Sequence, residues 1–160
     1  MTYRVMITCT GNICRSPMAE IVLRDRLDAA GLDAVVDSTG VSDEEAGNPI
    51  DPRASAALVR RGYAAGDAHV ARHAIASDVA ARGLVLAMTN QHARRLRDLA
   101  PGADVRLYRT FDPAAYDLGD HALDVADPWY GGPADFEICL DEIEAAADGV
   151  VAHVKAALAS

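Results

Sequence analysis

Short apolar runs that alternate with segments of helical periodicity are the feature of this sequence that most constrains its fold. Four runs predict strands: Arg4 to Thr8, Ala34 to Ser38, Leu84 to Met88 and Val105 to Arg109. The third is apolar at every position, as parallel strands buried on both faces are. Strands separated by helices favour right-handed crossovers with helices on both faces of the sheet. We therefore predict an α/β fold with an open four-stranded parallel sheet.

Capping and turn residues set the bounds of the helices expected between these strands. The expected helices run from Pro17 to about Ala30, from Pro52 up to Gly62, from His92 to Ala100 and from about Ala134 to Leu158. Glycines at positions 31 and 62 would end the first two, and Asp51 with Pro52 supplies a typical N-cap and first helical residue. The last helix has one apolar face, formed by Phe136, Leu140, Ile143, Ala147, Val150, Val154 and Leu158. Ligands of such sheets bind at the carboxyl ends of the strands, where the strand order reverses.

Composition excludes several classes of protein. The chain has 160 residues, so residues 1–160 are expected to form a single domain. Its 51% of hydrophobic residues excludes a disordered chain. Fifteen basic against 24 acidic residues give a net charge of -9, which argues against binding to nucleic acid or to an anionic membrane surface. No apolar run reaches the roughly 18 residues of a membrane span.

The expected compartment follows from the N-terminus and the cysteines. The chain turns polar again by Thr8, so a signal peptide is not expected. Three cysteines, an odd number without a secretory signal, indicate free thiols in a reducing compartment. Lys155 is the single lysine among 15 basic residues and alanine is abundant, a bias typical of GC-rich coding. We expect a bacterial, cytoplasmic protein.

The run from Cys9 to Pro17 lies where the first strand ends and the first helix begins. Gly11 and Asn12 tolerate positive φ, so the loop can turn successive backbone N–H groups toward one point. Ser16 and Pro17 suit the N-cap and first position of the helix, whose N-terminus would face the same point. These features predict an anion cradle of phosphate size. Its loop consists of Thr10, Gly11, Asn12, Ile13, Cys14, Arg15 and Ser16.

Cys9 and Arg15 would give this cradle its chemistry. Cys9 lies at the base, where loop N–H groups and the helix dipole stabilise a thiolate. Arg15 returns to the rim and offers a planar fork to two phosphate oxygens. A thiolate beneath a tetrahedral anion suits in-line attack on phosphorus. The alternative is that Cys9 is simply a small buried hydrophobe. The sequence lacks the Gly-Lys-Ser/Thr of a nucleotide P-loop and the Gly-x-Gly-x-x-Gly of a dinucleotide site.

The run CTGNICRSPMAE resembles the signature of the low-molecular-weight protein tyrosine phosphatases. Asp127-Pro128-Trp129-Tyr130 resembles their second motif, an Asp-Pro followed by two aromatic residues. The stretches Asp51-Pro52-Arg53-Ala54 and His69-Val70-Ala71-Arg72 also match, in order and at plausible spacing. The resemblance covers the whole chain. It implies hydrolysis of a phosphotyrosine-containing protein or a small aryl phosphate, with inorganic phosphate as product and with neither metal nor other cofactor.

The resemblance also implies a role for each catalytic residue. Cys9 attacks and becomes phosphorylated, while Arg15 and the loop amides hold the transferring group. Asp127 protonates the leaving oxygen and then activates the water that hydrolyses the phosphocysteine. Trp129 and Tyr130 would flank a flat substrate ring. The other Asp-Pro pair, at residues 112–113, is interpreted as a loop turn.

Several further residues receive supporting roles or stay ambiguous. Asn12 and Ser16 resemble the family residues that fix the loop and hydrogen-bond the thiolate, and His69 resembles a histidine that braces the loop from behind. The spacing of His69 and His73 could bind a metal on a helix, but no third ligand stands nearby. Cys14 has two open interpretations, a packed thiol or a partner that traps oxidised Cys9 as a disulfide. The third cysteine, at position 139, is expected in the core.

Two positions depart from the family's pattern. Glu44 stands at a rim position that is usually a tryptophan or another large group, so one apolar wall is lost and repulsion of an anionic substrate is added. Thr89, after Met88, stands where the family has an acidic residue that acts as a charged brace. Both departures leave substrate choice and rate open.

Two alternative functions remain beside phosphatase activity. An arsenate reductase on the same fold relays a disulfide through further cysteines, and no cysteine lies between Cys14 and Cys139. A phosphate- or phosphotyrosine-binding module with little turnover would not need an acid, so Asp127 argues against it, whereas Glu44 and Thr89 keep it open. Assays of aryl phosphate hydrolysis and of arsenate-dependent thioredoxin oxidation separate the three functions.

Overall fold

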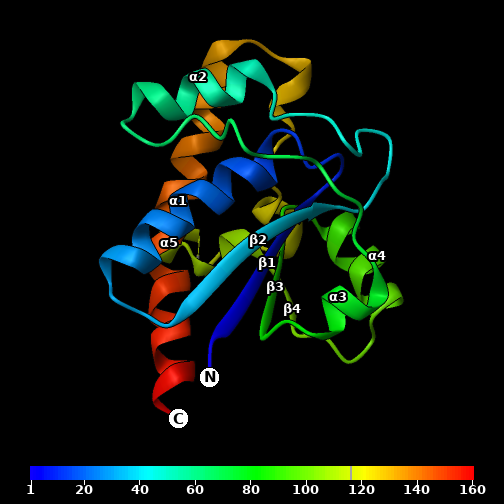
Figure 1. Ribbon diagram of the computed structural model, residues 1–160, viewed down its shortest axis with the longest axis vertical. Helices are drawn as coiled ribbons and strands as arrows, with labels where there is room; N and C mark the ends of the chain where they lie inside the picture. The colour runs from blue at the N-terminus through cyan, green and yellow to red at the C-terminus, as the bar shows by residue number, and fades with distance from the viewer. Residues whose placement is uncertain (116) are drawn as a thin grey trace.

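A parallel sheet of four strands forms the centre of the computed structural model, which describes residues 1–115 and 117–160 (Figure 1). The strands are β1 (Tyr3–Cys9), β2 (Ala34–Gly40), β3 (Leu84–Ala87) and β4 (Val105–Leu107). Their order is β2-β1-β3-β4, and each neighbouring pair is parallel. The prediction of an open four-stranded parallel sheet is confirmed.

The order of the strands determines where a ligand can bind. From β1 the chain crosses first to β2 on one side and then returns to place β3 on the other side of β1. Cys9 at the end of β1 pairs with Gly40 of β2, and Thr8 pairs with Ala87 of β3. The carboxyl end of β1 therefore lies at the point where the strand order reverses, the usual ligand position in such sheets.

Helices cover both faces of the sheet, as predicted. The α-helices are α1 (Arg15–Ala29), α2 (Pro52–Arg60), α3 (Ala76–Ala80), α4 (Asn90–Leu99) and α5 (Pro133–Ala159). Short 3-10 helices are η1 (Tyr108–Phe111), η2 (Pro113–Ala115), η3 (Asp120–Leu123) and η4 (Pro128–Tyr130). Figure 1 shows α1 and α5 on one face of the sheet and α3 and α4 on the other.

Successive residues of β1 contribute to two different cores. Val5 and Ile7 pack in a cluster with α1, α2 and α5, whereas Met6 belongs to a second cluster with α3 and α4. All three side chains are fully buried. Because successive side chains of a strand point to opposite faces, burial of every position requires a layer of helices on each side.

Local signals place some helix ends correctly. Asp51 caps α2, accepting a hydrogen bond from the backbone N–H of Arg53, and Pro52 is the first helical residue. Gly31 and Gly62 have φ of 66° and 85°, and they follow the ends of α1 and α2 as expected. The Asp-Pro pair at residues 112–113 forms the predicted turn, in which the Asp112 carboxylate accepts from the Ala114 N–H.

Other helix bounds were predicted wrongly. The first helix begins at Arg15 rather than Pro17, and Cys14 rather than Ser16 is its N-cap. The hydroxyl of Ser16 bonds within the site instead of capping the helix, as described below. The fourth helix begins at Asn90 rather than His92, because the side chain of Thr89 caps it. The five-residue α3 was not predicted at all.

The described helices include none that is both long enough and apolar enough to cross a membrane.

Candidate active site

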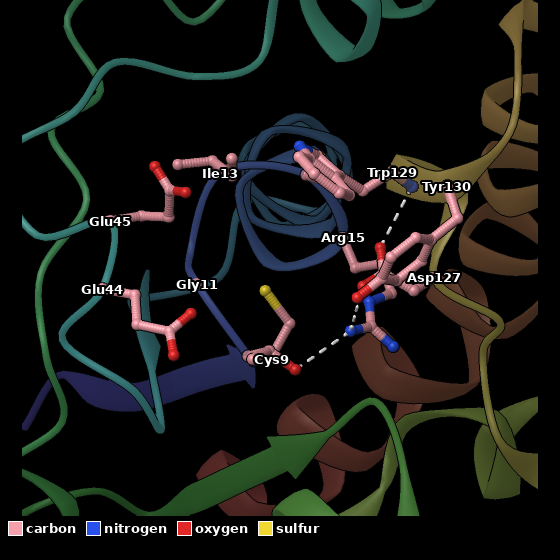
Figure 2. A pocket seen from close by; sticks show the side chains of 11 residues that line it. Cys9, Gly11, Ile13, Arg15, Glu44, Glu45, Asp127, Trp129 and Tyr130 are labelled. Atoms are coloured by element: carbon pink, nitrogen blue, oxygen red, sulfur yellow. Dashed lines mark hydrogen bonds and ion pairs between the residues drawn. The ribbon is translucent and has the colours of Figure 1, made fainter.

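A pocket of about 200 Å³ opens at the carboxyl end of β1 (Figure 2). Its lining residues are Cys9, Thr10, Gly11, Ile13, Cys14, Arg15, Glu44, Glu45, Asp127, Trp129 and Tyr130. They come from the end of β1, the loop that follows it and the start of α1, from the segment after β2, and from the segment before α5. The pocket thus brings together the three predicted catalytic residues, at positions 9, 15 and 127, and the three predicted rim residues, at positions 44, 129 and 130.

Cys9 lies at the base of the pocket, where its side chain is only 2% exposed. Its Sγ lies 3.0 Å from Oγ of Ser16. The Asn12 side-chain amide donates to the same Oγ at 2.8 Å, so the Ser16 proton is left for the sulfur or for the Thr39 carbonyl, which is 3.4 Å away. The shorter contact favours donation to the sulfur. A hydroxyl that donates to sulfur stabilises a thiolate more than a thiol.

Asn12 holds the loop from behind rather than lining the pocket. Its φ is 62°, which asparagine tolerates better than most residues. Its side-chain amide also donates to Oγ of Ser38 at 2.9 Å, and its Oδ1 accepts from the Arg72 N–H at 3.0 Å. Nε2 of His69 donates to its carbonyl oxygen at 2.7 Å. The structure therefore places His69 behind the loop, as the resemblance implies.

Loop residues 11–14 leave their backbone N–H groups available. Among the described residues, none accepts a hydrogen bond from these four groups. Unpaired N–H groups of successive loop residues beside a helix N-terminus can bind an anion. Gly11 does not have the positive φ that the sequence suggested. Instead it allows close approach, because a Cβ there would lie 3.0 Å from Cγ of Glu45.

Arg15 reaches across the pocket from the first turn of α1. Its Nη1 donates to the carbonyl oxygen of Val125 at 2.9 Å, and its Nη2 donates to Oγ1 of Thr10 at 3.3 Å. The same Nη2 lies 3.5 Å from Oδ2 of Asp127. Nε is buried and has no partner among the described residues. The guanidinium is held in place while one buried donor remains for a ligand.

Asp127 faces the pocket from the segment before α5. Its Oδ1 accepts from the Trp129 N–H at 3.1 Å and so caps η4. Trp129 and Tyr130 stack edge to face with centroids 5.1 Å apart, and they are 49% and 83% exposed. Exposed aromatic rings at the rim of a small anion pocket provide walls for a flat group attached to that anion.

Acidic side chains form the opposite rim. Backbone N–H groups of residues 41 and 42 donate to the carbonyls of Cys9 and Thr10, which brings the segment after β2 against the loop. A Cβ at Gly40 would lie 2.7 Å from the Thr10 carbonyl oxygen, so glycine permits this approach. Figure 2 shows the Glu44 carboxylate pointing toward Cys9. Glu45 also lines the pocket and accepts from the Asn48 side chain at 2.7 Å.

Thr89 does not line the pocket. Its hydroxyl accepts from the His92 N–H at 3.2 Å, and Nε2 of His92 lies 2.8 Å from Oγ1 of Thr10. His92 is 3% exposed, and its Nδ1 has no partner in the described part of the chain. Burial, reinforced by the positive charges of Arg15 and Arg95, lowers the pKa of His92 to about 3. A neutral imidazole therefore braces this side of the site.

Cys14 lines the pocket, and burial, together with the nearby Asp51 carboxylate, raises its pKa. Both interpretations of Cys14 stay predictions. Cys139 lies in the core, as expected. His69 and His73 are not on a helix, and His73 donates from Nε2 to the Val41 carbonyl at 3.2 Å, away from Asn12. Within residues 1–115 and 117–160, no group of three or more potential ligands could hold a metal ion.

Sequence reasoning missed three contributors to this site. Glu45 directly follows Glu44, the predicted rim residue, so its place in the sequence could have indicated that it also lines the pocket. His92 and the carbonyl of Val125 gave no signal, because their contacts depend on how β3, α4 and the segment before α5 meet the loop.

Comparisons with known proteins agree with this geometry. The family described as low molecular weight phosphotyrosine protein phosphatase matches residues 4–160. A low molecular weight protein-tyrosine-phosphatase of Streptomyces coelicolor is 48% identical over 161 residues, covering 97% of this chain and 95% of that protein. The low molecular weight protein-tyrosine phosphatase A of Mycobacterium tuberculosis is 43% identical over 149 residues, covering 91% and 88%. The crystal structure of a protein tyrosine phosphatase from Entamoeba histolytica, with Hepes in its active site, superposes with a TM-score of 0.87 at 25% identity, covering 98% and 99%.

Proposed function

The chain belongs to the low molecular weight phosphotyrosine protein phosphatase family, and we propose that Cys9, Arg15 and Asp127 carry out its reaction. It is a hydrolase of phosphoric monoesters whose substrates are phosphotyrosine proteins. The observation that carries the assignment of residues is their convergence in one pocket, with the sulfur at its base and the carboxylate across from it.

In the first step the Cys9 thiolate attacks phosphorus. The S–P bond forms as the P–O bond to the tyrosyl oxygen breaks, and the electron pair moves onto that oxygen, which takes the proton of Asp127. Arg15 and the N–H groups of residues 11–14 stabilise the charge on the transferring oxygens. The free Nε of Arg15 and the unpaired loop donors support this role.

In the second step water hydrolyses the phosphocysteine. The Asp127 carboxylate takes a proton from the water, whose oxygen attacks phosphorus as the S–P bond breaks. Inorganic phosphate leaves and the Cys9 thiolate is regenerated, stabilised by the Ser16 hydroxyl at 3.0 Å. Every charge in both steps is met by a group of this chain, so the mechanism uses no cofactor.

Exposed aromatic side chains support an aryl substrate. Trp129 and Tyr130 stand at the mouth beside Asp127, and Ile13 lines the pocket from the loop. A phosphotyrosine ring seated between them would place its phosphate near Cys9. Small aryl phosphates should therefore also be substrates. Arsenate reduction gains no support, because both curated relatives described above are phosphatases.

The bacterial cytoplasm is our proposal for the compartment in which the protein acts. Its three free cysteines and the two bacterial relatives support this assignment. The net charge of -9 supports the expectation that neither nucleic acid nor an anionic membrane is a partner.

The decisive experiment measures phosphate release from a phosphotyrosine peptide and from 4-nitrophenyl phosphate. Cys9→Ser should abolish release, because a serine hydroxyl is not ionised near neutral pH. Arg15→Ala should do nearly as much damage and also weaken binding of vanadate. Rapid acid quenching of the native protein should trap phosphate on Cys9. Substantial turnover by Cys9→Ser would exclude the phosphocysteine mechanism, and arsenate-dependent oxidation of thioredoxin without phosphate release would establish the reductase.

A further inference from the structure

The segment that carries Asp127 is only partly anchored by burial. Asp127 is one-third exposed, and Trp129 and Tyr130 are exposed as well, although Pro128 is buried. The segment then passes through Gly131 and Gly132 into α5. Glycines add backbone freedom, and exposed side chains contribute little apolar burial. Beyond the burial of Pro128, polar contacts must therefore determine where the segment sits.

Arg53 of α2 supplies such contacts from outside the segment. Its Nη1 donates to the carbonyl oxygen of Trp129 at 3.2 Å and to that of Gly131 at 3.1 Å. The two carbonyls flank the exposed Tyr130, so one guanidinium nitrogen holds both sides of the turn. Its guanidinium carbon also lies 4.7 Å from the centroid of the Phe136 ring in α5.

Arg53 is itself fixed in place by Asp51. Its Nε donates to Oδ1 of Asp51 at 3.1 Å and its Nη2 donates to Oδ2 at 2.9 Å, a two-point contact. Burial alone would raise the pKa of Asp51, but the hydrogen bonds from Arg53 outweigh it and hold that pKa below its usual range. Asp51 therefore stays charged near neutral pH.

The same aspartate is tied to the phosphate loop. The backbone N–H of Asp51 donates to the carbonyl oxygen of Ile13 at 2.9 Å. A continuous path of contacts thus runs from the loop around Cys9 through Asp51 and Arg53 to the carbonyls that follow Asp127. One end of the path bears the nucleophile and the other bears the proposed acid.

We infer that Arg53 is a positioning residue that holds the Asp127 segment across the pocket from Cys9, with Asp51 as its anchor. The inference rests on the proposed function, since it gives the Asp127 carboxyl its place opposite the thiolate. Arg53 does not line the pocket; its contact there is with the backbone of the lining residue Trp129. It holds the segment through the backbone of residues 129 and 131, and its positive charge also attracts the Asp127 carboxylate.

The tryptophan content of the chain permits a direct test. Trp129 is the single tryptophan, so fluorescence excited at a wavelength that tyrosine does not absorb reports on this segment alone. Arg53→Met keeps an aliphatic stem near Phe136 but removes every donor. We expect greater acrylamide quenching of Trp129 and lower fluorescence anisotropy in this variant. Arg60→Met is the matched control, because Arg60 lies on the same helix and pairs with Glu137 of α5 without contacting the Asp127 segment.

Steady-state kinetics then show whether the position of the Asp127 segment affects proton donation to the leaving group. Arg53→Met should lower kcat roughly tenfold for phenyl phosphate, whose leaving group needs a proton, and less than about twofold for 2,4-dinitrophenyl phosphate. In an Asp127→Asn background the same substitution should cause no further loss with phenyl phosphate, because the two residues act on one step. KM and vanadate affinity should change little.

A second variant covers the case in which Arg53→Met fails to fold with Asp51 left unpaired. Asp51→Asn/Arg53→Met removes the unpaired charge and keeps an N-cap residue. If a folded variant shows unchanged quenching of Trp129, the inference is overturned. It is also overturned if kcat falls equally with phenyl phosphate and 2,4-dinitrophenyl phosphate while Tm falls, because that pattern indicates a general loss of stability. If Asp127→Asn itself shows equal losses across leaving groups, the acid assignment fails, while the quenching result still decides the role of Arg53.

Discussion

Oγ1 of Thr10 lies 2.8 Å from Nε2 of His92, and the same oxygen accepts from Nη2 of Arg15. A buried imidazole of α4 thereby contacts the first residue of the phosphate loop, which in turn contacts the arginine. Thr89 contributes by capping the helix that carries His92. Where the resemblance to the family predicts an acidic residue after Met88, the structure has an uncharged connection through Thr89 and His92.

His92 should make the stability of the protein depend on pH. Its folded pKa, about 3, lies below the usual value of 6.5. Above pH 6.5 both the folded and the unfolded states hold a neutral ring, so the stabilisation is fully present. As the pH falls from 6.5 toward 3, the unfolded state binds a proton that the folded state does not, and stability is lost at a rate that approaches about 1.4 kcal/mol per pH unit.

Urea denaturation of the native protein and of His92→Gln at pH 7.5, 6 and 5 tests this prediction. The free energy of unfolding should fall more steeply for the native protein, because glutamine does not titrate. Parallel curves for the two proteins would mean that His92 takes up a proton in the folded state.

Ser16→Ala should slow both turnover and alkylation of Cys9 by iodoacetate at neutral pH. The substitution removes the hydroxyl that lies 3.0 Å from the sulfur. A hydrogen bond to a charged group contributes about 1.5–3 kcal/mol, so a roughly tenfold or greater loss is expected. Ser38→Ala is the matched control, because Ser38 also accepts from Asn12 but has no contact with the sulfur. If turnover and alkylation slow equally in Ser16→Ala and Ser38→Ala, the effect comes from Asn12 and the shape of the loop rather than from the hydrogen bond to sulfur.

Asp127→Asn separates proton donation from binding. Asparagine keeps the size and polarity of the side chain, and its oxygen can still accept from the Trp129 N–H. The deficit in kcat should be large for phenyl phosphate and smaller for a nitrophenyl phosphate, whose leaving group needs little protonation. A series of substituted phenyl phosphates measures the dependence. An equal deficit across the series would make Asp127 a residue that positions the substrate.

The sheet and most helices were predictable because their signals are local. The run Leu84 to Met88 is apolar since β3 is buried on both faces, and Asp51 with Pro52 marks the start of α2. The start of α1 was misplaced because Ser16 fits an N-cap by residue type, whereas its hydroxyl bonds Asn12 and Cys9. Periodicity cannot reveal α3, which is five residues long.

The residues of the candidate site that belong to sequence motifs were predictable, whereas the tertiary contacts that hold them in place were not. Cys9 and Arg15 belong to one continuous run, and the resemblance added Asp127. Two of the contacts that hold them join residues far apart in the sequence. Arg15 contacts the carbonyl of Val125, 110 positions away, and Arg53 contacts that of Trp129, 76 positions away. Neither contact leaves a pattern in the sequence, because the acceptor is a backbone oxygen.

Glu44 lines the pocket at the position where the resemblance to the family predicts a tryptophan or another large group. Its carboxylate points toward Cys9, where a substrate would bring close to two negative charges. Such charges repel over a Debye length of about 10 Å at 0.1 M salt. Without an aromatic side chain at position 44, the substrate ring also loses one ring–ring contact. Such a contact typically contributes about 0.5–1.5 kcal/mol beyond simple burial. The native protein should therefore act weakly on phenyl phosphates and prefer peptides with Arg or Lys beside the phosphotyrosine.

Glu44→Trp should lower KM for an aryl phosphate and flatten its salt dependence, with a smaller change in kcat, because Cys9, Arg15 and Asp127 are untouched. Glu44→Gln removes the charge without adding a ring, so it should flatten the salt dependence and lower KM less than tryptophan does. Asp43→Asn is the matched control, since Asp43 is exposed next to Glu44 but does not line the pocket. Michaelis series at low and high salt measure all four proteins. If KM stays unchanged in Glu44→Trp at both salt concentrations, or if Asp43→Asn reproduces the effect of Glu44→Gln, then Glu44 does not act on the substrate at the mouth of the site.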